Sequence, residues 1–371
     1  MSRLLSVLSC CLIGISLSML NFNKKEIDIE NKECEENPEE VAVTEITLNS
    51  ALPFSNVLVN YTNIGLSTQA GAINCLVVSN TDSNLVLAGA QNGGVWISHD
   101  AAHSWQPVND TARTLCVTSI AQNFFRPNEF YYSTGVNITV NNQLLYDIYR
   151  SVDFGQTFSI VHPVTPSFGR VSKILTSPID SNTLYVLNNA PSGTGSLYRT
   201  TDNCTTFQLV YQANVVIDDI ILLPNGIVEI GYAHSVWRST TGNSGTFVQS
   251  TGLPVTGYDT HLVFCKSLPN IQYCSVHIFP GYDIYKSIDS GQTWTLMSNI
   301  AQGRRLGVKP DNPDLVFAGN IWSNVSIDGG VTWQYSYGGH DLRSYNFDPH
   351  RSGKIYITSD FGVCTQEVDP V

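Results

Sequence analysis

One eight-residue pattern recurs along the chain and limits what the chain can fold into. It reads Ser-x-Asp-x-Gly-x-Thr-Trp at residues 287–294, and close copies lie at 326–333 and 151–158. Weaker copies lie at 98–105 and 200–207, and a degenerate copy without the aspartate lies around 239–247. The pattern aspartates are separated by 53, 49, 87 and 39 residues, and the interval of 87 spans the degenerate copy. A period of about 40–50 residues is typical of a repeated unit of four short strands.

The pattern is that of the Asp box, so the chain resembles the Asp-box (bacterial neuraminidase repeat) β-propellers. That superfamily includes sialidases, xyloglucanases, the sortilin luminal domain and the photosystem II assembly-factor propellers. The resemblance implies that residues 51–371 form an all-β propeller of four-stranded antiparallel blades, with each box as the turn between the third and fourth strands. A turn aspartate accepts hydrogen bonds from neighbouring backbone and hydroxyl groups. We therefore expect a structural role for Asp100, Asp153, Asp202, Asp289 and Asp328.

The two ends of the chain each contribute an incomplete unit. Six units carry a box or its remnant, and a seventh begins at Ser344 but stops one strand short. At the N-terminal end, the segment 57–66 alternates between apolar and polar residues, as a strand does, and belongs to no complete unit. We predict seven blades closed by this N-terminal strand, because closure removes exposed sheet edges.

The first 50 residues have a different character. Arg3 precedes an apolar run over 4–20, which predicts a secretory signal peptide over residues 1–20; the alternatives are an uncleaved signal anchor and a lipoprotein cysteine at Cys10. Residues 21–50 are acidic and predict a disordered linker, although a propeptide or an interaction tail would look similar. Five Asn-x-Ser/Thr sequons follow, at Asn60, Asn109, Asn137, Asn203 and Asn324. We expect a secreted, extracellular glycoprotein, a monomer without a stable membrane span.

Seven cysteines remain after the predicted signal peptide, so not all can pair within the chain. Cys265 and Cys274 flank a predicted two-residue turn at Pro269-Asn270, which would place them opposite each other on antiparallel strands. We predict a disulfide between them; two buried free thiols are the alternative.

Composition excludes one class of partner. The net charge is −12 and charged residues make up only 13% of the chain, so no surface could neutralise nucleic-acid phosphates. The cysteine, histidine and aspartate spacings do not match a metal site, and we expect neither a metal nor another cofactor.

The resemblance implies that a ligand binds where the inner strands start. The residues just before the predicted inner strands are polar or charged, Arg304 among them, although a water-filled polar funnel would look the same. As ligand contacts we expect Arg113, Arg170, Tyr258, His261, Arg305, His340 and Arg343.

Two functions fit these residues. The first is a non-catalytic propeller that binds a glycan or an extracellular protein or peptide. The second is a glycoside hydrolase, which needs two carboxyl groups; Asp259 and Asp341 form the best pair, with Asp218 or Asp219 in reserve. The resemblance weighs against catalysis, because the sialidase Phe/Tyr-Arg-Ile-Pro signature is absent and xyloglucanases build their cleft between two propellers.

Overall fold

The computed structural model describes residues 60–64, 66, 70–135, 139–140, 143–144, 146–161, 169–337 and 341–368. The predicted signal peptide and acidic linker lie outside these residues, as does His340. The described residues form seven four-stranded antiparallel sheets and one small sheet of β8 (Thr139–Val140) and β9 (Gln143–Leu144). They contain no helix that could cross a membrane. The predicted all-β class is confirmed.

Each of the seven sheets is one blade, and we number the blades in chain order. Blade 1 consists of β2 (Ile73–Val78), β3 (Val86–Ala90), β4 (Val95–Ser98) and β5 (Gln106–Val108). Blade 2 consists of β6 (Val117–Gln122), β7 (Phe130–Thr134), β10 (Ile148–Ser151) and β11 (Ser159–Val161). Blade 3 consists of β12 (Arg170–Thr176), β13 (Leu184–Asn189), β14 (Gly195–Thr200) and β15 (Gln208–Ala213). Blade 4 consists of β16 (Asp219–Leu222), β17 (Val228–Tyr232), β18 (Ser235–Ser239) and β19 (Val248–Gln249). Blade 5 consists of β20 (Tyr258–Phe264), β21 (Gln272–Ile278), β22 (Gly281–Ser287) and β23 (Thr295–Ile300). Blade 6 consists of β24 (Arg305–Lys309), β25 (Asn312–Gly319), β26 (Ser323–Ser326) and β27 (Gln334–Tyr337). Blade 7 consists of β28 (Ser344–Phe347), β29 (Lys354–Ser359), β30 (Gly362–Glu367) and β1 (Asn60–Asn63).

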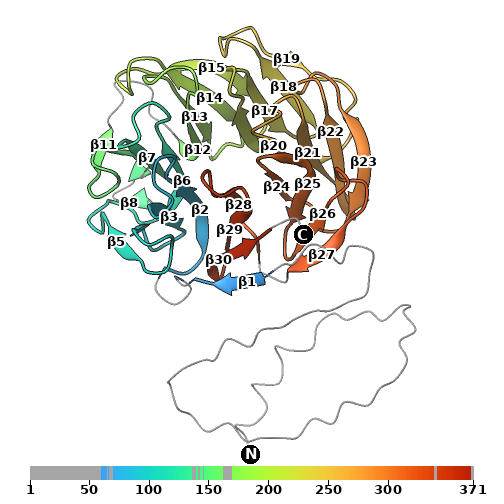
Figure 1. Cartoon of the computed structure of the whole chain (residues 1–371). Coiled ribbons are helices and arrows are strands. Elements are labelled where there is room, and N and C mark those ends of the chain that lie inside the picture. The colour runs from blue at the N-terminus through green and yellow to red at the C-terminus, as the bar shows by residue number, and fades with distance from the viewer. Residues whose placement is uncertain are drawn as a thin grey trace, which may run out of the picture. The chain divides into compact units, whose positions relative to one another are not determined.

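The inner strands form a closed ring. Each first strand contacts the first strand of the next blade, in the cycle β2, β6, β12, β16, β20, β24, β28 and back to β2 (Figure 1). Apolar side chains fill the space between blades, as where Leu87 of blade 1 packs with Val117 and Tyr132 of blade 2. The blades approach so closely that a Cβ at Gly89 would lie 2.5 Å from Val117. The predicted seven-bladed propeller is confirmed.

The N-terminal strand completes blade 7. β1 pairs antiparallel with β30, with Asn60 opposite Glu367 and Asn63 opposite Cys364 (Figure 1). The amide of Ile64 continues the ladder by donating to the carbonyl of Val363 at 3.1 Å. Closure by the predicted segment 57–66 is therefore confirmed over 60–63, and 57–59 lie outside the described residues.

The box turns share one hydrogen-bond pattern. In blade 5, Oδ1 of Asp289 accepts bonds from the Ser287 hydroxyl at 2.8 Å and the Thr293 amide at 2.9 Å. Oδ2 accepts the Thr293 hydroxyl at 2.7 Å. In the other boxes, the Ser or Thr residues at the first and seventh positions donate the corresponding bonds to Asp100, Asp153, Asp202 and Asp328. The degenerate turn lacks the carboxylate, and Ser239 pairs directly with Thr246 instead.

The predicted disulfide between Cys265 and Cys274 is wrong. Both thiols are free, because Leu262 and not Cys265 lies opposite Cys274. The connection between β20 and β21 runs over 265–271 and is longer than the predicted two-residue turn. Cys265 consequently packs in the core shared with blade 6, whereas Cys274 packs in the core shared with blade 4.

One carboxyl group is buried beneath the junction of blades 4 and 5. Glu229 in β17 is fully buried and accepts a bond from Gln272 Nε2 at 3.0 Å. Glu229 Oε2 and Gln272 Oε1 lack hydrogen-bond partners, and a Cβ at Gly291 would lie 2.7 and 2.8 Å from them. A proton on Glu229 would supply the missing donor between these two oxygens. Burial raises the pKa of Glu229 to about 8, against the opposing effects of Gln272 and Arg238.

The first prediction concerns ring closure. A chain that starts at residue 67 lacks β1 and exposes the edge of β30. We expect its midpoint of thermal unfolding to fall by roughly 5–10 °C, through lost ladder bonds and blade contacts. A chain that starts at residue 51 is the control and should unfold like the full chain. Equal unfolding of both truncations would show that β1 does not close the ring.

The second prediction concerns the box turn of blade 5. Asp289→Ala removes several turn hydrogen bonds and should lower the free energy of unfolding by roughly 1–3 kcal/mol. Chemical denaturation measures this loss. Binding of any ligand should survive, and a stable variant that loses binding would contradict a purely structural role.

The third prediction concerns Glu229. Its folded-state pKa lies above the ordinary value of 4.5, so the native state holds a proton that the unfolded chain releases. The stability that protonated Glu229 contributes is therefore fully present below about pH 4.5 and is lost as the pH rises toward 8. Glu229→Gln cannot ionise, so we expect it to be more stable than the parent at pH 8 by roughly 1–4 kcal/mol, and to differ little at pH 5. Parallel pH profiles would refute a protonated Glu229.

Candidate functional site

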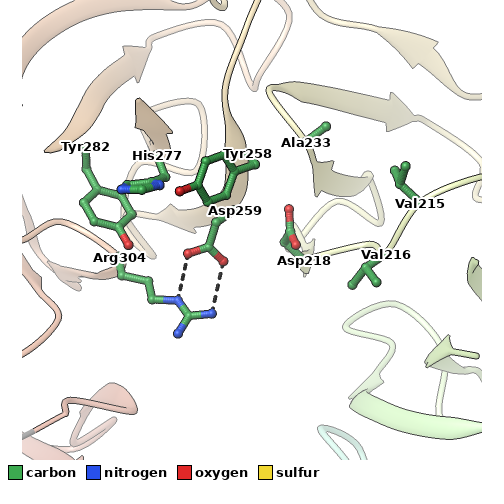
Figure 2. A pocket seen from close by; sticks show the side chains of 9 residues that line it. All are labelled: Val215, Val216, Asp218, Ala233, Tyr258, Asp259, His277, Tyr282 and Arg304. Atoms are coloured by element: carbon green, nitrogen blue, oxygen red, sulfur yellow. Dashed lines mark hydrogen bonds and ion pairs between the residues drawn. The ribbon is translucent and has the colours of Figure 1, made fainter. Parts of the chain in front are cut away.

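A pocket of about 530 Å³ opens where the inner strands of blades 4, 5 and 6 begin (Figure 2). Asp218 immediately precedes β16, Tyr258 and Asp259 begin β20, and Arg304 immediately precedes β24. The pocket therefore lies at the end of the inner strands from which the sequence predicts ligand contacts.

An irregular backbone directs Asp259 into this pocket. The pairing of β20 with β21 shifts register between Tyr258 and His261, and Asp259 within this bulge has a φ of +58°. A left-handed conformation is uncommon for a residue other than glycine, and bulges re-aim side chains. The carboxylate meets Arg304 in a two-pronged ion pair, with Nε–Oδ2 at 2.8 Å and Nη2–Oδ1 at 3.2 Å (Figure 2).

Beneath the pocket, His261 lies between two carboxylates. The ring is 6% exposed, with Nε2 at 3.1 Å from Asp259 Oδ1 and Nδ1 at 3.7 Å from Asp219 Oδ2. Asp219 also contacts Lys173 Nζ at 2.5 Å, and Arg305 approaches both ring nitrogens at 3.4 Å. Burial alone would raise the pKa of both carboxyl groups. The positive partners and hydrogen bonds outweigh burial and hold the pKa of Asp219 and of Asp259 well below the ordinary range.

Asp218 has a different environment from Asp259. Its Oδ2 accepts one bond from the Thr260 amide at 3.0 Å, and no described lysine or arginine lies within ion-pair distance. Burial raises the pKa of Asp218 to about 6; the negative charges of Asp259 and Asp219 add to the shift, and Thr260 and His261 oppose it. The surroundings therefore shift the pKa values of the two pocket carboxyl groups in opposite directions.

The rest of the pocket has an aromatic side and an aliphatic side. The rings of Tyr258 and His277 meet edge to face with their centroids 4.4 Å apart, and the ring centroids of His277 and Tyr282 are 4.6 Å apart. His277 Nδ1 is buried without a hydrogen-bond partner. Across from these rings lie the aliphatic side chains of the pocket (Figure 2): Val215, Val216 and Ala233.

The residues predicted as ligand contacts or as the catalytic pair divide into two groups. Tyr258, Asp259, His261 and Arg305 come together in or beneath the pocket, and their role in binding stays a prediction. The others that the structure describes do not line it, and His340 lies outside the described residues. Arg113 pairs with Asp147 at 3.2 Å, Arg343 makes two bonds to Asp360 at 2.9 and 2.7 Å, and Arg170 is exposed at the start of β12. Asp341 is exposed, has a φ of +51° and is not among the lining residues.

Five lining residues were not predicted from the sequence: Val215, Val216, Ala233, His277 and Tyr282. They lie in the β15–β16 connection and around the β17–β18 and β21–β22 turns, and not directly before an inner strand. The available signal was the position of His277 and Tyr282 on either side of Pro280-Gly281, a dipeptide that is typical of a turn. Within the described residues, no three His, Cys, Asp or Glu side chains are grouped to hold a metal ion.

No known family profile matches this chain, and no curated protein is significantly similar to it in sequence. Solved structures are similar in fold. The GH74 xyloglucanase from Xanthomonas campestris superposes with a TM-score of 0.66 at 14% identity, over 82% of this chain and 53% of that one. YCF48 bound to D1 peptide gives 0.61 at 16% identity, over 84% and 97%. The extracellular domain of the putative hybrid two-component system BT4673 from B. thetaiotaomicron gives 0.60 at 14%, over 82% and 39%.

These likenesses concern the fold alone, because all identities are low. The chain spans about half the length of the xyloglucanase, so that enzyme has a large part with no counterpart here. What the comparison establishes is that this chain is a seven-bladed β-propeller that shares its architecture with enzymes and with a peptide-bound protein.

Proposed function

We propose that this propeller is a secreted, non-catalytic binding module that takes a glycan or a protein ligand in the pocket of blades 4 to 6. The observation that carries the proposal is a set of unsatisfied polar groups beside an aromatic wall. His277 Nδ1 has no partner, and Asp218 has no cation partner among the described residues. Pockets that bind ligands combine apolar walls with a few such convergent polar groups.

Asp259 supports binding over catalysis. Both of its oxygens are engaged, by Arg304 and by His261, so the carboxylate is held rigidly and is strongly ionised. Such partners lower the basicity of the carboxylate, whereas a general base works best with a pKa near the operating pH. The similar structures support both ligand classes, since one is a xyloglucanase and another carries a peptide. The extracellular domain among them supports the proposed location.

A glycoside hydrolase is the second candidate, and one observation favours it. The pKa values of Asp218 and Asp259 are moved in opposite directions, which is the arrangement that separates a general acid from an ionised partner. Asp218 then takes the role predicted for Asp341, since Asp341 does not line the pocket. In that case Asp218→Asn should lower turnover of the cleaved glycoside by roughly 100-fold or more.

The fourth prediction tests the site by blocking it. Val216 lines the pocket and is 42% exposed, so Val216→Trp should fill the cavity without disturbing the core. A glycan array, a peptide library and a panel of glycosidase substrates identify a ligand for the parent protein. We expect Val216→Trp to weaken its binding by about tenfold or more, by steric exclusion.

The matched control is Val248→Trp on the outer strand of blade 4, where the side chain is 66% exposed. This variant should bind like the parent. Equal binding by both variants, with unfolding unchanged, would move the ligand site away from the pocket.

A further inference from the structure

Asp218 differs from most of the other carboxylates at the mouth of the propeller. Four of them have a lysine or arginine partner: Asp147 with Arg113, Asp219 with Lys173, Asp259 with Arg304 and Asp360 with Arg343. Asp218 has only the Thr260 amide, within the described part of the chain. A half-buried carboxylate without a counter-ion is unfavourable, so such a group in a pocket is a candidate for binding a cation.

The charges that face Asp218 also favour a cation. Asp219 adjoins it in blade 4, and Asp259 and His261 face it from blade 5. Arg304 is the one arginine in the pocket lining, and Asp259 neutralises it. The lining residues therefore carry one more negative than positive charge when Asp218 is ionised.

The pocket walls suit the remainder of such a ligand. Val215 and Val216 offer an aliphatic surface on one side, without hydrogen-bonding side chains (Figure 2). Tyr258 and Tyr282 contribute aromatic rings on the other side, and a cation is attracted to the face of such a ring. A lysine side chain combines an aliphatic stem with a compact charged head.

We propose that this pocket binds the ε-ammonium group of a lysine presented by a protein ligand, with Asp218 as its counter-ion. The proposal rests on the proposed binding function and selects a protein over a neutral glycan, which has no cation to offer. Asp218 must be ionised to act, so binding should weaken as the pH falls through the range in which Asp218 gains a proton.

The test uses small probes and the intact protein. Nα-acetyl-lysine N-methylamide is titrated at pH 7.5 while the methyl signals of Val215 and Val216 are followed by NMR. We expect saturable shifts, with affinity at least about tenfold weaker for the Nε-acetylated probe, for the norleucine analogue and for butyrate. Asp218→Asn should weaken binding by a similar factor, and the parent should bind more weakly at pH 5 than at pH 7.5.

Asp283→Asn is the control, because Asp283 lies in β22 outside the pocket lining and should leave binding unchanged. Preference for butyrate or norleucine, binding unaffected by Asp218→Asn, or no methyl shift with any amine would overturn the proposal. Tighter binding of leucine N-methylamide would assign the pocket to a chain terminus and overturn the lysine assignment. If the ligand found for the parent is lost in Val216→Trp while lysine probes do not bind, the binding function stands and this inference fails.

Discussion

The pairing of β1 with β30 is the contact on which the rest of the molecule depends. Without it, blade 7 would keep three strands and the ring would be held at this point by side-chain packing alone. The four-residue ladder supplies the missing outer strand, and Ile64 and Leu66 then join the core between blades 7 and 1. A closed ring fixes the angle between every pair of neighbouring blades, because no blade can move outward without breaking two interfaces.

That rigidity allows three blades to build one pocket. Asp218, Asp259 and Arg304 belong to different blades, and each lies at or beside the start of an inner strand. The bulge at Asp259 places a non-glycine residue in the left-handed region, a cost that the surrounding ion pair and hydrogen bonds offset. The surroundings then set the chemistry, since positive partners hold the pKa of Asp259 well below its ordinary range, while burial without a counter-ion raises the pKa of Asp218 to about 6.

Local interactions could be predicted from the sequence, and interactions across blades could not. The box turns hold themselves together within eight residues, so Asp289 and its counterparts reveal the blade count and the missing strand. Position before an inner strand was enough to find Tyr258 and Asp259. Arg113 and Arg343 precede the inner strands of blades 2 and 7, outside the pocket, and they pair with Asp147 and Asp360, partners that no local pattern encodes. The disulfide prediction failed because the register of β20 against β21 places Leu262 opposite Cys274, and Cys265 packs in the core shared with blade 6.

The most direct test of this account is amide hydrogen exchange along β1. If residues 60–63 close the ring, those of their amides that bond to β30 should exchange only when the propeller opens as a whole, roughly 100-fold or more slowly than an unstructured segment. Their protection should match that of β30, the strand with which they pair, and both should be lost together with rising denaturant. Exchange of β1 at the rate of an unstructured chain, while β30 stays protected, would show that the ring is closed without the N-terminal strand.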